Sequence, residues 1–263
     1  MRLVRYTPAR YTPAAGGPAS YGLLDGHGDD AVVVRLEGSP FDGIRPTDER
    51  TPLREVTLLA PVEPSKVLCF GRNYAEHAKE LGNEVPEIPV VFSKFSTSIV
   101  GPGADVVYPE LTSNLHFEGE LAIVIGRRCT RVKPEEAAEV VLGYTVANDL
   151  TMRDMQRAEK QWTRAKGFDG SCPLGPWIET DVDPGALSLR TTVNGEIRQD
   201  GTTADMLLDV AACIAWVSQT LTLLPGDVVL TGTPAGVGPL QVGDEVAVTV
   251  EGIGTLATRI TAG

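Results

Sequence analysis

The sequence predicts a mixed, β-rich α+β fold in which strands outnumber helices. Among its 263 residues are 28 glycines and 19 prolines, which favour turns and strands over long helices. Short apolar runs alternate with turn-rich stretches along most of the chain. The length lies near the upper limit for one hydrophobic core, so we expect one main domain with a small appendage.

Residues 1–60 are predicted to form a small β-rich subdomain. Short apolar runs there, LVRY, YGLL and AVVVRL, alternate with stretches rich in Gly, Pro and Asp. The segment APVEP at residues 60–64 is interpreted as a connector, because prolines restrict the backbone. The main domain is therefore expected to cover residues 61–263.

The main domain is predicted to be a mixed or antiparallel-rich sheet with a few helices. Helices are expected near residues 73–82, 134–141, 151–160 and 204–223. The last overlaps the longest uncharged stretch, Val210 to Gly226, which is shorter than the roughly 20 apolar residues of a membrane span. We interpret it as a buried helix. Strands are expected at KVLCF, PVVFSKF, ELAIVIG, VLGYTVAND, LSLRTTVNG, DVVLTG and EVAVTV.

Charge and cysteine content exclude several classes of protein. The formal charge of −12, from 23 basic and 35 acidic residues, opposes binding to nucleic acid. The 4 cysteines form no C-x-x-C pair, so neither a zinc knuckle nor a dithiol site is indicated. No apolar run follows the basic amino terminus, so no secretory signal is indicated. A reduced, cytoplasmic setting without membrane contact is expected.

A pair of carboxylates opens one apolar strand. In HFEGELAIVIG, Glu118 and Glu120 are two residues apart, so period-two geometry places both on one face. Two like charges repel unless a cation or hydrogen bonds compensate, and a divalent metal is one reason to build such a pair. A solvated strand face is the alternative.

A third carboxylate lies where a strand is expected to meet a helix. In GYTVANDLTMRDMQ, Thr151 and Asp154 match the capping-box pattern, which places Asp149 at the junction. Asp149 is then either an active-site group or a simple cap. On the helix, Arg153 and Gln156 share a face and are either contacts for a substrate carboxylate or part of a solvated surface.

Two further segments carry candidate catalytic groups. In FGRNYAEHAKELG, His77 and Glu80 are spaced i,i+3, so the carboxylate can orient the imidazole of a general base. In RAKGFDGSCPLGP, Lys166 lies in a Gly-rich turn and is able to stabilise an oxyanion. A surface His-Glu pair and a solvated lysine are the alternatives. His116 is interpreted as structural and His27 as a surface turn residue.

The glycine-rich segment DVVLTGTPAGVG has neither the G-K-[ST] of a phosphate loop nor a G-x-G-x-x-G that opens a helix. Nucleotide binding and nicotinamide chemistry are therefore not indicated. The Thr233 hydroxyl and nearby backbone amides are able to hold a small carboxylate, with a plain turn as the alternative.

Taken in order, these segments resemble the fumarylacetoacetate hydrolase family, and the likeness covers residues 62 to 263. It also includes VVFSKF, GPGADVVYP, VNGE and GDEVAVTVEGIGTL. The resemblance implies a rolled mixed β-sheet and a divalent metal, usually Mg²⁺ with Mn²⁺ as an alternative. It also implies a homodimer, and a lid formed by residues 74 to 90.

The resemblance further implies roles for the candidate residues. Glu118, Glu120 and Asp149 would be the metal ligands. His77 and Glu80 would be the base, Lys166 would assist beside the metal, and Arg153, Gln156 and Thr233 would contact the substrate.

The chain lacks the larger amino-terminal domain of the eukaryotic namesake enzyme and resembles the small bacterial branch. We therefore expect a substrate that is a small 2-oxo diacid or an acylpyruvate, and a C–C hydrolysis or decarboxylation that passes through a metal-stabilised enolate. The alternatives are a 2-hydroxyhepta-2,4-diene-1,7-dioate isomerase, an oxaloacetate tautomerase and, in another class, a non-catalytic binding protein.

Overall fold

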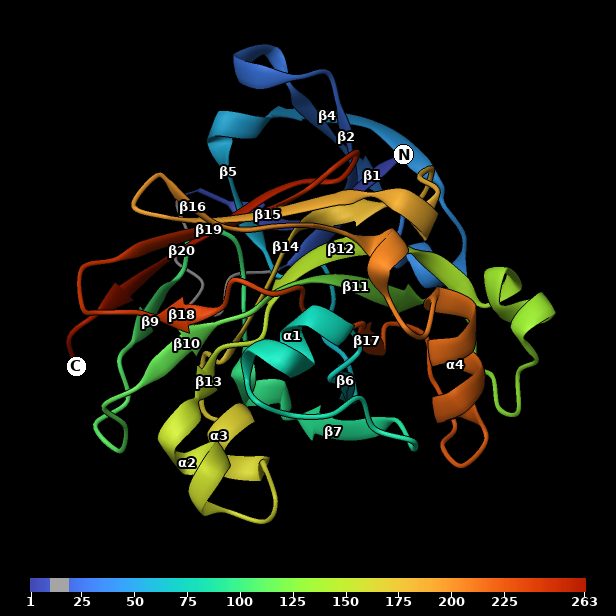
Figure 1. Cartoon of the computed structure of the whole chain (residues 1–263). Helices are drawn as coiled ribbons and strands as arrows, with labels where there is room; N and C mark the ends of the chain where they lie inside the picture. Colours follow the sequence, from blue (N-terminus) through green and yellow to red (C-terminus); the bar gives the residue numbers. More distant parts are fainter. Residues whose placement is uncertain (10–18) are drawn as a thin grey trace.

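The computed structural model describes residues 1–9 and 19–263, and strands dominate this part of the chain (Figure 1). The N-terminal strands are β1 (Arg2–Pro8), β2 (Ser20–Asp25), β3 (Val32–Leu36), β4 (Pro46–Pro52) and β5 (Val56–Leu59). The next are β6 (Val67–Gly71), β7 (Val90–Lys94), β8 (Ile99–Val100), β9 (Asp105–Val107), β10 (Leu115–Phe117), β11 (Gly119–Ile125), β12 (Val141–Asn148) and β13 (Thr151–Met152). The last are β14 (Cys172–Glu179), β15 (Ser188–Val193), β16 (Glu196–Thr202), β17 (Val228–Leu230), β18 (Gly238–Pro239), β19 (Glu245–Val250) and β20 (Gly254–Thr261).

The described helices are few and short. They are α1 (Ala75–Glu80), α2 (Arg153–Ala158), α3 (Thr163–Lys166) and α4 (Val210–Ser218). A 3-10 turn (Pro134–Glu139) stands where the helix near 134–141 was expected. In the part of the chain that the structure describes, no helix has both the length and the apolar character needed to cross a bilayer.

The strands form three sheets in the described part of the chain. The largest has 12 strands in the order β4-β3-β2-β1-β14-β12-β11-β17-β6-β7, with β5 and β8 paired to β1 and β14. The others have the orders β13-β10-β18 and β16-β15-β19-β20-β9. Most pairs are antiparallel, whereas β6 with β17, β8 with β14 and β9 with β20 are parallel. The predicted mixed, β-rich fold is confirmed.

The central strand β11 is buried along its whole length. Leu121, Ile123 and Ile125 face one apolar cluster, while Ala122 and Val124 face another on the opposite side of the sheet. Because both faces are covered, a shift by one residue would exchange the two sets of side chains, so the register of β11 is strongly specified. This register sets the position of the carboxylates at the start of the strand.

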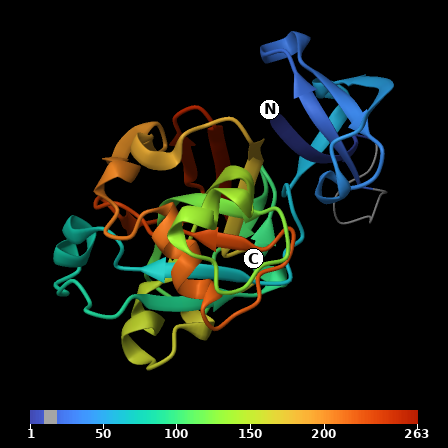
Figure 2. The same cartoon turned by 90° about the vertical axis from the view of Figure 1, so that its right-hand side faces the viewer.

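The N-terminal strands join the main sheet at its β14 strand. Strand β1 pairs with β14 through Arg2 with Glu179 and Leu3 with Ile178, and the amino group of Met1 lies 2.6 Å from Glu179 Oε1. Figure 2 shows these N-terminal strands, in blue, to one side of the remaining chain. The boundary at residue 60 stays a prediction.

Two local predictions are wrong. The capping box does not form, because Thr151 lies in β13 and its hydroxyl donates to the carbonyl of Asp149 at 2.9 Å. The helix then begins at Arg153 without a side-chain cap. The helix expected over 204–223 is confined to α4, since the backbone N–H groups of Leu207 and Leu208 donate instead to Asn73.

Candidate active site

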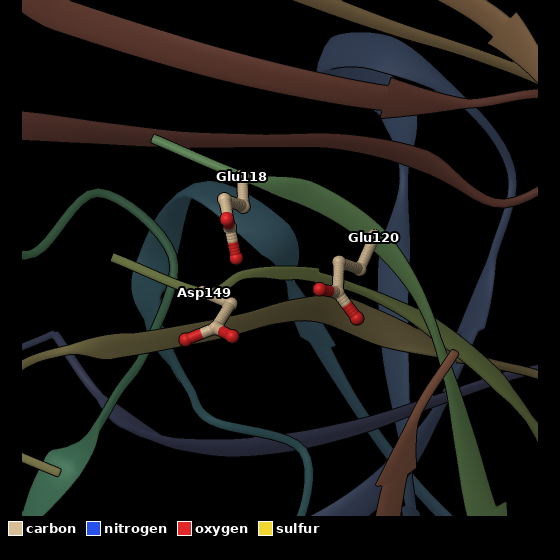
Figure 3. Close-up of side chains that lie close together, drawn as sticks. All are labelled: Glu118, Glu120 and Asp149. Atoms are coloured by element: carbon tan, nitrogen blue, oxygen red, sulfur yellow. The ribbon is translucent and has the colours of Figure 1, made fainter. Parts of the chain in front are cut away.

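Glu118, Glu120 and Asp149 come together at adjacent ends of β11 and β12, as Figure 3 shows. The two strands are antiparallel, with Gly119 opposite Asn148. The N–H of Asp149 donates to the carbonyl of Glu118 at 2.8 Å, and Asn148 Oδ1 accepts from the N–H of Glu118 at 3.0 Å. One oxygen atom from each of the three buried carboxylates lies within 4.8 Å of the others. The strand register alone therefore assembles the cluster.

Glu118 is surrounded by basic side chains. Its carboxylate accepts hydrogen bonds from Arg153 and from Lys166 Nζ, the latter at 2.5 Å. Burial by itself would raise the pKa of Glu118, but Arg153, Lys166 and His77 outweigh burial and hold it well below its ordinary value. Glu118 is therefore a carboxylate anion, as a metal ligand must be.

Lys166 is buried and lies between two carboxylates. Its Nζ is 2.8 Å from Asp149 Oδ2, and the carboxylates of Asp149 and Glu118 raise its pKa although burial opposes this. The lysine is therefore charged. It was expected in a Gly-rich turn, but it is the last residue of the short helix α3. The alternative of a solvated lysine is excluded for this residue, which is 2% exposed.

Glu120 differs from the other two carboxylates because it has no basic partner within 4 Å among the described residues. It accepts one hydrogen bond, from the N–H of Gly232 at 2.7 Å. Burial, and then repulsion by Asp149 and Glu118, raise the pKa of Glu120 well above its ordinary value. A buried carboxylate beside two others, with no cation of its own, fits a hard divalent cation that prefers oxygen ligands.

Lys94 belongs to the same cluster, and sequence reasoning missed it. Its Nζ lies 2.7 Å from Asp149 Oδ1 and donates to the carbonyl of Ser171 at 2.8 Å and to that of Lys166. The side chain ends strand β7 and is 2% exposed. A charged residue at the end of the apolar run PVVFSKF was the one signal in the sequence that could have found it.

His77 and Glu80 face each other on α1, as their spacing predicted. His77 Nδ1 is 3.4 Å from Glu80 Oε2, and His77 Nε2 is 3.8 Å from Glu118 Oε1. Burial lowers the pKa of His77, so the imidazole is neutral near pH 7 and able to accept a proton. The other oxygen of Glu80 accepts from the N–H of Gly236 at 3.0 Å, which ties α1 to the glycine-rich segment.

Arg153 and Gln156 lie together on α2. Arg153 donates to Gln156 Oε1 at 2.8 Å and to Glu118. The alternative of a solvated helix face does not hold for Arg153, whose exposure is 2%. Gln156 is half-buried and lines the same cavity as Arg153.

Thr233 is part of a buried polar network rather than of a plain turn. Its hydroxyl donates to the carbonyl of Gly119 at 2.8 Å and accepts from Gln199 Nε2 at 2.7 Å. Gln199 Oε1 in turn accepts from the N–H of Gly119 at 3.0 Å. Gln199 stands in no motif of the sequence, yet it links the glycine-rich segment to the start of β11.

These residues surround a cavity of about 280 Å³. Its walls contain the predicted site residues His77, Glu118, Glu120, Arg153, Gln156, Lys166 and Thr233. Asp149 lies beside them in the carboxylate cluster, and Glu80 lies behind His77. His116 and His27 lie outside the walls, and His116 Nε2 is 2.9 Å from Asn114 Oδ1.

Two family models match the chain. Residues 66–261 match the model described as fumarylacetoacetate (FAA) hydrolase C-terminal, and residues 1–61 match the model described as Rv2993c-like, N-terminal. Among curated proteins, Protein Rv2993c of Mycobacterium tuberculosis is 51% identical over 224 residues, which are 84% of each chain. The human protein named oxaloacetate tautomerase FAHD2A, mitochondrial, is 46% identical over 222 residues, 80% of this chain and 71% of that one.

Solved structures show the same similarity. The structure described as 2-hydroxyhepta-2,4-diene-1,7-dioate isomerase from Mycobacterium marinum is 45% identical, with a TM-score of 0.90 over 100% of this chain and 98% of that one. A fumarylpyruvate hydrolase from Pseudomonas aeruginosa, in complex with Mn²⁺ and pyruvate, is 33% identical. Its TM-score is 0.72 over 82% of this chain and 93% of that one.

Proposed function

Because the chain belongs to the fumarylacetoacetate hydrolase family and is thus an enzyme, we propose that it uses a divalent cation to act on small 2-oxo acids. The observation that carries this proposal is the buried trio Glu118, Glu120 and Asp149 beside a cavity that His77 also lines. The trio offers only oxygen ligands, which suit Mg²⁺ or Mn²⁺. The Mn²⁺ and pyruvate of the Pseudomonas hydrolase support both the cation and the class of substrate.

Glu118, Glu120 and Asp149 would hold the cation. A divalent cation there would act as a Lewis acid and stabilise negative charge on the oxygen of the 2-oxo group. Lys166, charged and beside the trio, would add to this stabilisation. Lys94, which lies deeper against Asp149, would hold that carboxylate in place.

His77 would move the proton. Its neutral imidazole is able to take a proton from the carbon next to the 2-oxo group, or from a water molecule. Glu80, 3.4 Å from Nδ1, would fix the ring orientation and stabilise the protonated form. Arg153 and Gln156 would face the substrate from α2. Because the Thr233 hydroxyl already donates to Gly119, Thr233 would offer its N–H group or a remaining oxygen lone pair.

Of the candidate reactions, we place tautomerisation or isomerisation of an enolisable 2-oxo acid first. One relative at 46% identity is named a tautomerase, and one solved structure at 45% identity is described as an isomerase. In this reaction His77 returns the proton at another atom of the same substrate. C–C hydrolysis or decarboxylation, which the sequence put first, stays a prediction, and the hydrolase at 33% identity supports it. A non-catalytic binder is disfavoured, since binding alone needs no neutral base beside the trio.

The test follows oxaloacetate, acetylpyruvate and 2-hydroxyhepta-2,4-diene-1,7-dioate by ultraviolet absorbance and product analysis, with Mg²⁺ and with a chelator. Cation-dependent absorbance change with conserved mass would support tautomerisation or isomerisation. Release of pyruvate or carbon dioxide would support C–C cleavage instead. Cation binding without turnover of any of the three would favour the binding protein.

Three further expectations stay predictions. A homodimer is checked by light scattering, a lid at residues 74–90 by hydrogen exchange with and without a ligand, and a cytoplasmic location by cell fractionation. The proposed partner is the small-molecule substrate, and neither nucleic acid nor membrane is proposed as one.

A further inference from the structure

Helix α2 carries Arg153 and Gln156 into the cavity wall but is too short to hold its own position. It has 6 residues, and the side chain of Met152, the residue before it, makes no cap hydrogen bond to its first turn. An isolated helix shorter than about 12 residues is marginal in water. The place of these two side chains therefore depends on contacts between α2 and the rest of the chain.

The start of α2 lies against a turn of a distant segment, residues 112–114, called here the 112–114 turn. The carbonyl of Asn114 accepts from the N–H of Arg153 at 2.9 Å. Strand β10 follows the turn directly and pairs with β13, so that Leu115 lies opposite Met152. Backbone contacts thus hold the turn and the first residue of α2 side by side.

The carboxylate of Asp154 ties α2 to this turn through a side chain. Its Oδ1 accepts from the Thr112 hydroxyl at 2.5 Å, and its Oδ2 accepts from the N–H of Ser113 at 3.0 Å. Oδ1 also accepts from the N–H of Met155 at 2.9 Å, one of the groups that a helix start leaves without a backbone partner. Burial would raise the pKa of Asp154, but these hydrogen bonds outweigh burial and lower it. Asp154 is therefore an anion that closes the first turn of α2.

The 112–114 turn is in turn fixed by its own side chains. Thr112 is 8% exposed, and its hydroxyl oxygen accepts from the N–H of Asn114 at 3.0 Å while the hydroxyl donates to Asp154. The side-chain oxygen of Asn114 is 2.9 Å from His116 Nε2, and an amide oxygen only accepts, so the imidazole donates. Removing the Thr112 hydroxyl would therefore break both the turn and its link to α2.

These contacts set the geometry of the buried ion pair between Arg153 and Glu118. Asn114, which accepts the Arg153 N–H, precedes Glu118 by 4 residues, and β10 lies between them. From α2, Arg153 donates back to the Glu118 carboxylate and to Gln156 Oε1. A shift of α2 against the turn would move the guanidinium relative to the trio, and a misplacement of about 1 Å can cost about 100-fold in rate.

We propose that Asp154 and Thr112 are positioning residues, which hold α2 so that Arg153 and Gln156 meet the substrate beside the trio. This inference rests on the proposed function, in which the latter two side chains face the substrate. Because the trio stands on other elements, breaking the link between α2 and the turn is expected to weaken substrate binding but not cation binding.

The test measures two affinities by titration calorimetry, that of Mn²⁺ for the protein and that of pyruvate for the protein saturated with Mn²⁺. Pyruvate is the probe because the Pseudomonas hydrolase holds it together with Mn²⁺. Asp154→Ala removes the carboxylate, and Thr112→Val removes the hydroxyl with little change in shape. Each is expected to weaken pyruvate about tenfold, the size of effect of one hydrogen bond to a charged group, and to leave Mn²⁺ affinity within about threefold. Thr112→Ser, which restores the hydroxyl, should return pyruvate affinity to within about twofold.

Two further variants separate positioning from a general loss of stability. The control Asp183→Ala also removes a carboxylate that accepts from a backbone N–H, that of Gly185 at 3.0 Å, but in a turn outside the cavity walls. It is expected to change neither affinity. In an Arg153→Lys background, Asp154→Ala should weaken pyruvate by less than about twofold, because the group that Asp154 positions is already altered.

Circular dichroism checks that each variant is folded at the temperature of the titration, and Thr112→Val covers the case in which Asp154→Ala does not fold. Folded Thr112→Val protein with unchanged pyruvate affinity would overturn this inference alone. So would an undiminished effect of Asp154→Ala in the Arg153→Lys background. If the unaltered protein bound Mn²⁺ but no pyruvate, the proposed function would be wrong, and this inference with it.

Discussion

Lys94 Nζ lies 2.7 Å from Oδ1 of Asp149, and neither side chain is exposed. Lys166 approaches the other oxygen of the same carboxylate, so Asp149 is enclosed between two ammonium groups. A buried ion of this kind needs an oppositely charged partner, because an unpaired buried charge is far more costly than a solvated one.

Replacing Lys94 by methionine is therefore expected to destabilise the protein by about 3 kcal/mol, because part of the Asp149 charge loses its partner. Urea unfolding in the presence of a chelator measures the change. Lys133→Met, at an exposed position, is the control and is expected to cost less than about 0.5 kcal/mol. The double variant Lys94→Met/Asp149→Asn should lose less stability than the sum of the losses measured for the two single variants. Full additivity would mean that the two groups do not stabilise each other.

Divalent cations are expected to raise the thermal midpoint of unfolding. A cation that binds the native state at a concentration 100-fold above its Kd adds about 2.7 kcal/mol of stability. Differential scanning fluorimetry with Mg²⁺ or Mn²⁺ should show an upward shift of several degrees that a chelator abolishes. Glu120→Gln should remove the shift while the protein stays folded, and Glu84→Gln, on the exposed loop after α1, should retain it. An unchanged shift in Glu120→Gln would argue against the trio as the cation site.

His77→Asn is expected to lower kcat by about 10²–10⁴-fold, because the variant lacks the group that accepts the proton. Cation affinity, measured by calorimetry, should stay close to that of the unaltered protein. The control is His27→Asn, at an exposed turn, which should change neither quantity. Loss of cation affinity together with activity would make His77 a ligand rather than a base.

Gly236→Ala is expected to reduce both stability and activity. The Gly236 N–H donates to Glu80, and its φ is 101°. A Cβ at this position would stand 2.1 Å from the carbonyl oxygen of Arg198, so the segment must move and Glu80 loses its donor. The control is Gly243→Ala, where φ is 98° but a Cβ would meet no atom within 4 Å. Steady-state kinetics on both variants separates the contact from the backbone strain, and equal activity in the two would exclude a role for the Gly236 contact.

The Glu118–Glu120 pair and the His77–Glu80 pair were predictable because each depends on a short-range pattern, whereas Asp149 joins the two glutamates through the pairing of β11 with β12. Glu118 and Glu120 have the period of a strand, and His77 and Glu80 have the spacing of a helix turn. The same patterns left open whether these groups were buried, since burial depends on residues far along the chain. That dependence is why sequence reasoning placed Lys166 in a Gly-rich turn, with a solvated lysine as an open alternative, and α4 in a much longer helix.

Lys94 and Gln199 show what local patterns cannot reveal. Lys94 acquires its partners from Asp149 and Ser171, which follow it by more than fifty residues. Gln199 connects Gly119 to Thr233 across three separate segments. Gln199 does not stand out from its sequence neighbours, and the position of Lys94 at the end of an apolar run does not reveal its partners, because tertiary contacts define both roles.

The cavity is lined by two parts of the fold that differ in how well they tolerate amino-acid replacements. The trio stands at adjacent ends of β11 and β12, and β11 is buried along its whole length, so replacements there disturb the core. Arg157 stands on a helix of six residues with an exposed outer face, where replacements have small effects on folding. Replacing Arg157, which also lines the cavity, can thus alter the cavity wall while the trio stays intact. The same scaffold can in this way supply enzymes with different substrates.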